Sequence, residues 1–189
     1  MKSFIYITVE MFTDIRDIRD IRSWLPIVAA ACLVDTAGLF VWRYTAETDG
    51  PVNTWYDQFG LTAYVADITS MVIGIMLTQF VVTWIGGSWN PFLFCAVAVL
   101  IQLIHDVVFG NVIVPAIPTG HNAVMDLMKR YATMSGAGYV LLVDAIYMIL
   151  TALIAMSLTT KQAWPILAVT LYATTYILYT KRDRRQKSV

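Results

Sequence analysis

Charged side chains are scarce in this 189-residue sequence and are nearly missing from its middle. Charged residues make up 14% of the chain, against about 25% in an ordinary soluble domain. Between Gln58 and Met125 the only Asp, Glu, Lys or Arg residues are Asp67 and Asp106. A stretch this long and this poor in charge cannot form the surface of a water-soluble domain, so the composition excludes an ordinary soluble globular protein.

Several features of enzymes and of nucleic-acid-binding proteins are also lacking. The formal net charge is +0, which gives no basis for nucleic acid as a partner. The two cysteines, Cys32 and Cys95, lie in apolar segments and are expected to be packing residues. The sequence has no phosphate-binding loop, glycine-rich nucleotide fingerprint, cysteine-pair metal site or nucleophile elbow. It therefore favours a protein that is not an enzyme, and it predicts no organic cofactor.

Apolar runs long enough to cross a bilayer recur along the chain and predict an all-α polytopic membrane protein. A hydrocarbon core of about 30 Å requires about 20 residues of helix. We expect a single bundle over residues 24–180, with about five spanning helices at 24–43, 61–84, 92–110, 139–158 and 163–180. The bundle is the fold class that the sequence predicts.

The two ends of the chain and one connecting segment are expected to lie at the membrane surface. Residues 1–23 have apolar residues at helical spacing and then three Asp-Ile-Arg repeats, which predict an amphipathic interfacial helix with internal ion pairs. The alternative is a solvated helix with the same ion pairs. Residues 121–134 predict a second, shorter amphipathic helix. The basic tail, 181–189, favours a cytoplasmic C-terminus.

A proline-containing segment follows the third expected span. Residues 111–119 stay apolar, but their two prolines are expected to break any helix, so the segment should be extended or re-entrant and packed against protein. Asn122 is expected to cap the helix that follows, and His121 to be a loop residue. The segment is a candidate lid over the polar layer described next, formed by Pro115, Pro118, Gly120, His121 and Asn122.

Four of the expected spans each carry one aspartate at a similar depth. Counted from one side of the membrane at a rise of about 1.5 Å per residue, all four lie about 6 to 12 Å inside. Small residues share their helix faces, which lets helices approach closely and turns the aspartates into the bundle. The expected intramembrane layer consists of Asp35, Asp67, Gln102, His105, Asp106 and Asp144.

The chemistry of this layer leaves three interpretations open. An ionised group in the middle of a membrane costs about 2.5 to 3.5 kcal/mol on insertion scales, so the aspartates must be paired, protonated or hydrated. His105 is the only base at their depth. The layer could fix the helix packing by hydrogen bonds, form a proton or cation path, or bind a divalent metal. The candidate metal ligands are Asp67, His105, Asp106 and Asp144.

Aromatic residues gather in the connections between spans. The segment 44–60 is expected to be a polar loop that ends in Trp55 and Tyr56. Tryptophan and tyrosine are enriched where a membrane protein meets the headgroups. We therefore expect Trp55, Tyr56, Trp84 and Trp89 to be interface anchors rather than parts of a binding site.

A series of motifs runs from residue 53 to residue 157. Trp55-Tyr56-Asp57-Gln58-Phe59-Gly60-Leu61 is followed by Ala66-Asp67, Gln102-Leu-Ile-His105-Asp106, Pro115-x-x-Pro118-x-Gly120-His121-Asn122, Asp126, Tyr131-Ala132 and Asp144. This pattern resembles an uncharacterised family of multi-pass membrane proteins of large DNA viruses, including viruses of algae. The resemblance implies a setting and no chemistry: the internal membrane of a virion, or a host endomembrane used in assembly.

The expected function follows from the composition and from this resemblance. We expect a non-enzymatic structural or assembly component of a viral or virus-modified membrane. Its partners would be the lipid bilayer and capsid or other virion membrane proteins. The sequence leaves the formation of oligomers open. The alternative is a membrane protein that conducts protons or cations, or binds a metal, through the Asp/His layer.

Overall fold

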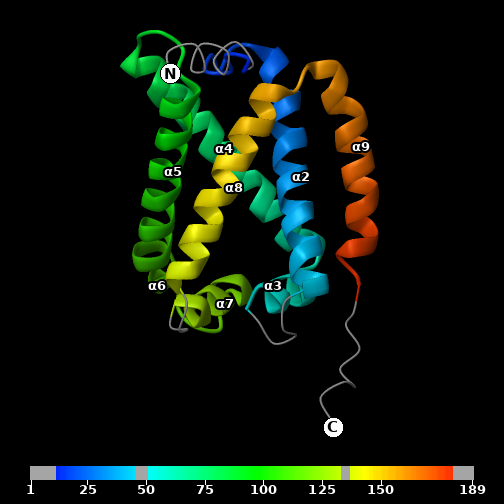
Figure 1. Cartoon of the computed structure of the whole chain (residues 1–189). Coiled ribbons are helices and arrows are strands. Elements are labelled where there is room, and N and C mark those ends of the chain that lie inside the picture. The colour runs from blue at the N-terminus through cyan, green and yellow to red at the C-terminus, as the bar shows by residue number, and fades with distance from the viewer. Residues whose placement is uncertain (1–11, 46–50, 133–136, 181–189) are drawn as a thin grey trace.

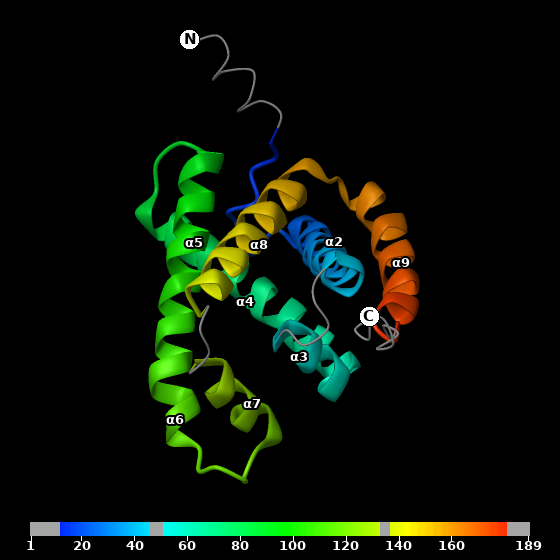
Figure 2. The same ribbon diagram turned by 60° about the horizontal axis from the view of Figure 1, so that its bottom comes forward.

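The computed structural model describes residues 12–45, 51–132 and 137–180, and most of these residues are helical (Figure 1). The predicted all-helical class is confirmed. Five long helices stand side by side: α2 (Ile21–Thr45), α4 (Leu61–Ile85), α5 (Pro91–Val108), α8 (Ala137–Ser157) and α9 (Thr160–Ile177). Two short helices, α3 (Pro51–Phe59) and α7 (Ala123–Ala132), lie across one end of this bundle (Figures 1 and 2).

Four helical stretches are long and apolar enough to cross a membrane, and they support an integral membrane protein. They are Ile21–Tyr44, Leu61–Ile85, Pro91–Ala116 and Gly138–Ser157. The fifth predicted span, 163–180, coincides with α9, which packs along α2 but does not belong to this group. Lys161 and Gln162 in its first turn, followed by threonines and tyrosines, make α9 less apolar than the others. A fifth span is therefore not confirmed.

Consecutive long helices are antiparallel, and two of the four connections, α4–α5 and α8–α9, are short turns. The turn between α4 and α5 contains Gly86 and Gly87, whose φ angles of 74° and 90° suit glycine better than residues with a Cβ. Asn90 then caps α5, because its side-chain oxygen accepts hydrogen bonds from the N–H groups of Phe92 and Leu93. Thr159 starts α9 with a reciprocal capping box.

The interior consists of two apolar clusters on either side of the aspartates. Ala31, Met71, Ala98 and Met148 belong to the cluster near the α4–α5 turn. The second cluster lies near α3 and α7, and it contains Leu39, Trp55, Tyr56, Ala63, Tyr64, Leu127 and Leu178. In sequence, Asp35 lies between Ala31 and Leu39, and Asp67 lies between Ala63 and Met71. The polar layer therefore separates the two clusters.

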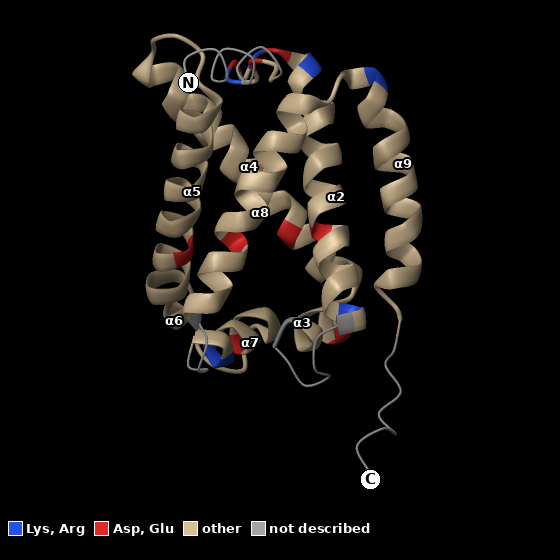
Figure 3. Ribbon diagram, viewed as in Figure 1, with Lys and Arg blue, Asp and Glu red and all other residues tan. Residues whose placement is uncertain are grey.

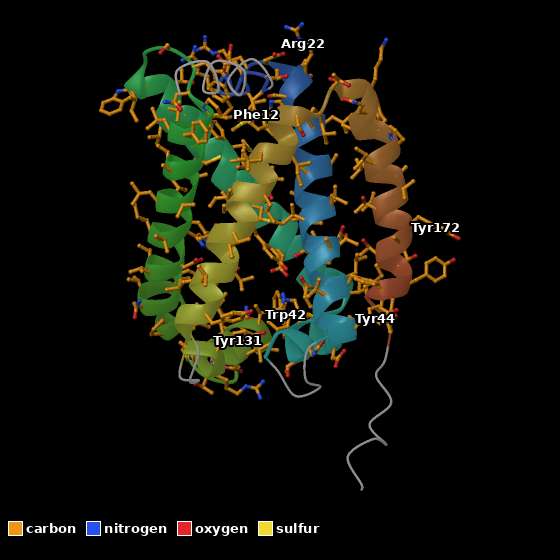
Figure 4. The ribbon with its side chains drawn as sticks, in the orientation of Figure 1. Phe12, Arg22, Trp42, Tyr44, Tyr131 and Tyr172 are labelled. Atoms are coloured by element: carbon orange, nitrogen blue, oxygen red, sulfur yellow. The ribbon has the colours of Figure 1, made fainter. Side chains whose placement is uncertain are left out.

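The Asp-Ile-Arg repeat does not form the amphipathic helix predicted for residues 1–23. Residues 12–20 are non-helical and cross the end of the bundle near the α4–α5 turn, while residues 1–11 lie outside the described part (Figure 4). Each aspartate accepts a hydrogen bond from the backbone N–H two residues later, in the pairs Asp14–Arg16, Asp17–Arg19 and Asp20–Arg22. Such local bonds compete with the helical pattern, which explains the wrong prediction.

This non-helical segment, residues 12–20, is held to α4 and α8 by hydrogen bonds. Gln79 of α4 donates to the Ile15 carbonyl at 2.5 Å, and Thr83 donates to the Arg16 carbonyl at 2.8 Å. The Thr13 N–H donates to the carbonyl of Met156 in α8. Ile15 is 3% exposed and belongs to the apolar cluster near the α4–α5 turn. The segment is thus an integral part of the bundle.

The third span is longer than predicted, because the helix continues to Ala116. Residues 111–116 were predicted to be extended or re-entrant, and this is wrong. A π-helical turn, η1 (Phe109–Ile113), leads into α6 (Val114–Ala116), and the Val114 N–H donates to the Phe109 carbonyl. A π turn widens the helix directly before Pro115, where a regular α-helix would bring the proline ring against the carbonyl four residues back. The chain leaves the helix at Ile117, just before Pro118.

Candidate functional site

Two aspartates from neighbouring spans meet at the side chain of Tyr56. The phenol oxygen of Tyr56 lies 3.0 Å from Asp35 Oδ1 of α2 and 2.8 Å from Asp67 Oδ2 of α4. Trp55 Nε1 donates a second hydrogen bond to the same Asp67 oxygen at 2.9 Å. Asp35 is 1% exposed. We call Asp35, Trp55, Tyr56 and Asp67 the tyrosine–aspartate cluster.

If both short contacts of the Tyr56 oxygen are hydrogen bonds, this cluster needs a proton beyond that of the phenol. The two short contacts of the Tyr56 oxygen each need a hydrogen, and a phenol supplies one. A carboxylic O–H on one of the two aspartates completes the set. Burial, and then the neighbouring acidic groups of Asp35 and Asp67, raise the pKa of Tyr56 well above its ordinary value, so the phenol stays neutral.

Helix α3 supplies the aromatic half of the cluster, and the sequence did not predict it. Residues 44–60 were expected to be a polar loop and Trp55 and Tyr56 to be interface anchors. Both predictions are wrong: Pro51–Phe59 is helical, and Trp55 and Tyr56 are 8% and 5% exposed. The consecutive aromatic residues reach Asp67 because α3 lies across the ends of α2 and α4 (Figure 2). The only signal in the sequence was the uncharged pair Trp55-Tyr56 directly before polar Asp57 and Gln58.

The remaining members of the predicted layer lie on α5 and α8. Figure 3 shows one acidic position on each of α2, α4, α5 and α8, at a similar level in the bundle. On α5, Asp106 Oδ1 accepts a hydrogen bond from Gln102 Nε2 at 2.8 Å and lies 3.1 Å from His105 Nδ1. Asp144 of α8 is partly buried. The four carboxyls therefore share a level, and Asp35 and Asp67 are the pair that one side chain joins.

His105 points away from the interior rather than into the layer. Its side chain is 51% exposed and stacks on Phe109, with the two ring centroids 5.6 Å apart. Together with Gln102 it forms one wall of a groove of about 370 Å³ between α4 and α5. The opposite wall consists of α4 residues, among them Ala66, Ser70 and Gly74. We call this the α4/α5 groove.

The candidate lid lies apart from the tyrosine–aspartate cluster. Pro115, Pro118, Gly120, His121 and Asn122 are all exposed. Asn122 caps α7 as expected, because its Oδ1 accepts from the N–H groups of Val124 and Met125. Leu127 of α7, which is 3% exposed, belongs to the same apolar cluster as Trp55 and Tyr56. The cover on this side is therefore α7, whose apolar residues pack against the cluster that contains Trp55 and Tyr56.

No set of three or more His, Cys, Asp or Glu residues is placed to hold a metal ion within residues 12–45, 51–132 and 137–180. Of the candidate ligands, His105 and Asp106 are adjacent on α5, and Asp67 is bonded to aromatic donors instead. The proposed metal site stays a prediction.

Two further polar contacts in the bundle were not expected. Arg43 is 7% exposed although it lies near the end of α2. Its guanidinium lies 2.7 Å from Asp57 Oδ1 and donates to the Leu178 carbonyl at 3.0 Å, so it joins α2 to α3 and to the end of α9. On the same side of α2, the hydroxyls of Thr36, Tyr64 and Thr174 lie within 2.7 to 3.3 Å of one another.

No protein-family model matches this chain, and neither a curated protein nor a solved structure matches it. The site must therefore be interpreted from its own geometry.

Proposed function

We propose that this chain is a non-enzymatic multi-pass membrane protein in which the acidic layer holds the helices together. The observation that supports this function is the Tyr56 oxygen between Asp35 and Asp67. One side chain of α3 bonds to α2 and α4 at the level where the apolar clusters separate. In a bilayer the hydrophobic effect does not drive helices together, so packing and interhelical hydrogen bonds do.

The setting is part of the proposal. The motifs between residues 53 and 157 resemble membrane proteins of large DNA viruses, so we propose a structural or assembly component of a viral internal membrane or a virus-modified host endomembrane. Its partners are the lipid bilayer and other virion proteins. Helix α9 ends on the same side of the bundle as α3 and α7, and we propose that this side, with the basic tail 181–189, is cytoplasmic.

A second candidate is a proton or cation conductor. Two carboxyl oxygens, Asp35 Oδ2 and Asp106 Oδ2, are buried without a hydrogen-bond partner among the described residues. A buried acceptor without a donor is costly, and a proton or a cation would satisfy it. Both aspartates lie in the acidic layer, so one experiment separates this candidate from the structural one.

The experiment compares wild-type protein with the Asp35→Asn and Asp67→Asn variants in liposomes. Proton flux is followed with an entrapped pH dye under a potassium diffusion potential, and bound metal is measured by elemental analysis. We expect wild-type liposomes to leak no faster than protein-free liposomes and to retain no stoichiometric metal. We expect both variants to unfold at lower temperature in detergent.

Asp17→Asn is the matched control. Asp17 is exposed at the end of the bundle, and asparagine can still accept the bond from the Arg19 N–H. This variant should behave as wild type in both assays. Wild-type flux or one bound metal per chain, lost in Asp35→Asn or Asp67→Asn and kept in Asp17→Asn, would replace the structural function with the second candidate.

A further inference from the structure

We propose that this chain assembles head to tail within the membrane, with α9 of one copy packed into the α4/α5 groove of the next. The inference rests on the proposed function, because it says how an assembly component would assemble. It is argued from two surfaces of the bundle that face outward at the same depth.

The α4/α5 groove carries polar atoms that lack partners at membrane depth. Gln102 is 7% exposed; its Nε2 donates to Asp106, and no described residue donates to its Oε1. His105 uses Nδ1 toward Asp106, and no group in the described part of the chain bonds its Nε2. Both residues lie in the spanning stretch Pro91–Ala116, where water cannot satisfy them. A neighbour with hydrogen-bonding groups would satisfy these atoms, whereas lipid acyl chains would not.

The opposite wall of the groove suits a helix. Ala66, Ser70 and Gly74 follow one another at intervals of four residues on α4, and all three line the groove. Small residues at this spacing let a second helix approach closely, and polar residues beside them add interhelical hydrogen bonds. A cavity of about 370 Å³ with both features can receive side chains from the face of a transmembrane helix.

The outer face of α9 has the matching character. Tyr172 and Tyr176 are 68% and 63% exposed, and their hydroxyls bond each other at 3.2 Å. A pair of hydroxyls joined by one hydrogen bond has a second O–H left to donate. Figure 4 shows Tyr172 pointing away from the bundle. Since α9 is not among the helices apolar enough to cross a membrane by themselves, protein on its outer side would complete it.

The two surfaces agree in depth and in hydrogen bonding. In the same view, Tyr172 lies at about the level of the acidic positions, and Gln102 is bonded to Asp106 of that layer (Figures 3 and 4). All copies insert with the same orientation, so the hydroxyl donors of α9 face the Gln102 acceptor of a neighbour. Because α5 and α9 lie on opposite sides of the bundle, the contact is heterologous and forms a ring or an open array (Figures 1 and 2).

Cysteine cross-linking in liposomes tests this arrangement. Cys32 and Cys95 are first replaced by alanine, and the melting temperature is compared with that of wild type. Thr69, which is exposed and lines the groove, and Tyr172 are then replaced by cysteine, singly and together, and the liposomes are mildly oxidised. We expect a ladder of dimers, trimers and larger species from the double variant, and monomers from either single variant. A mixture of the two single variants should stop at the dimer.

The control pair is Leu142→Cys with Tyr172→Cys, since Leu142 is 56% exposed on α8 near the acidic layer. It should stay monomeric. Dimers from Tyr172→Cys alone would show symmetric α9 pairing, and dimers from Thr69→Cys alone would show symmetric groove pairing; either overturns the proposal. A ladder in both double variants would show random collision, and no cross-link at all would leave lipid or a different protein in the groove; both also overturn it.

Energy transfer between labelled copies gives a second measurement. Tyr172→Phe and Gln102→Leu should each weaken association by about 3- to 20-fold, the range of interhelical hydrogen bonds in membranes. Unchanged association in both would overturn the hydrogen-bonding part. Neither assay depends on ion flux, so failure of the assembly proposal can be distinguished from failure of the proposed function.

Discussion

Replacing Tyr56 by phenylalanine removes one oxygen from the interior and keeps the aromatic ring that packs between Trp55, Tyr64 and Leu127. Asp67 would keep its bond from Trp55 Nε1. Asp35 would lose the one partner of its Oδ1, while its Oδ2 already has none among the described residues. The cost therefore falls on Asp35, whose carboxyl would be buried without a donor.

The free energy of unfolding should fall by about 1 to 3 kcal/mol, the cost of leaving a buried polar group without a partner. A chain of this length changes its melting temperature by about 2 to 4 °C per kcal/mol, so the shift should be about 2 to 12 °C downward. The assay is thermal unfolding of the purified protein in detergent, followed by tryptophan fluorescence. Tyr139→Phe is the matched control, because the Tyr139 side chain is 57% exposed, and its melting temperature should not change.

A double-mutant cycle with Asp35→Asn identifies the partner. If Tyr56 acts through Asp35, the double variant should lose less stability than the sum of the two single variants. Additive losses, or a Tyr56→Phe variant as stable as wild type, would refute the view that this phenol links α2 to α4.

Two further predictions concern a close helix contact and the pH dependence. Gly38→Ala should destabilise the bundle by about 1 to 3 kcal/mol, because a Cβ there would collide with the Tyr147 hydroxyl; Tyr147→Phe should restore part of the loss, and Gly138→Ala, with nothing within 4 Å, should be tolerated. Burial raises the pKa of Tyr56 well above 10.0 in the folded protein. Its stabilisation is therefore complete below pH 10 and is lost as the pH rises through the folded-state pKa, so unfolding curves should show a steeper loss above pH 10 for wild type than for Tyr56→Phe.

The depth of the aspartates could be predicted from the sequence, because a helix advances by a fixed rise per residue. Counting residues from the ends of the apolar runs placed Asp35 and Asp67 at one level, and the structure brings them to one phenol. The same counting says nothing of rotation about the helix axis. That is why it placed His105 in the layer, whereas its side chain faces the α4/α5 groove.

The features that the sequence did not predict arise where two interactions compete, and a sequence pattern does not show which of the two is stronger. The spacing of Asp and Arg in the repeat suits helix pairs, but each aspartate bonds its own backbone instead. Pro115 predicts a break, but a π turn carries the helix past it. Tyr56 fits an interfacial position as well as a buried one, and only the packing of α3 under α2 and α4 decides between them.

The non-helical segment of residues 12–20 constrains the order in which the chain can assemble. Its partners Gln79, Thr83, Gly87 and Met156 are all synthesised after it, and the last of them lies near the end of α8. The segment is synthesised before α4 and α8 and must therefore wait for both of them before all these contacts can form. The segment docks only if it lies on the same side of the membrane as the α4–α5 turn. An α4–α5 hairpin inserted in the wrong orientation would therefore prevent docking.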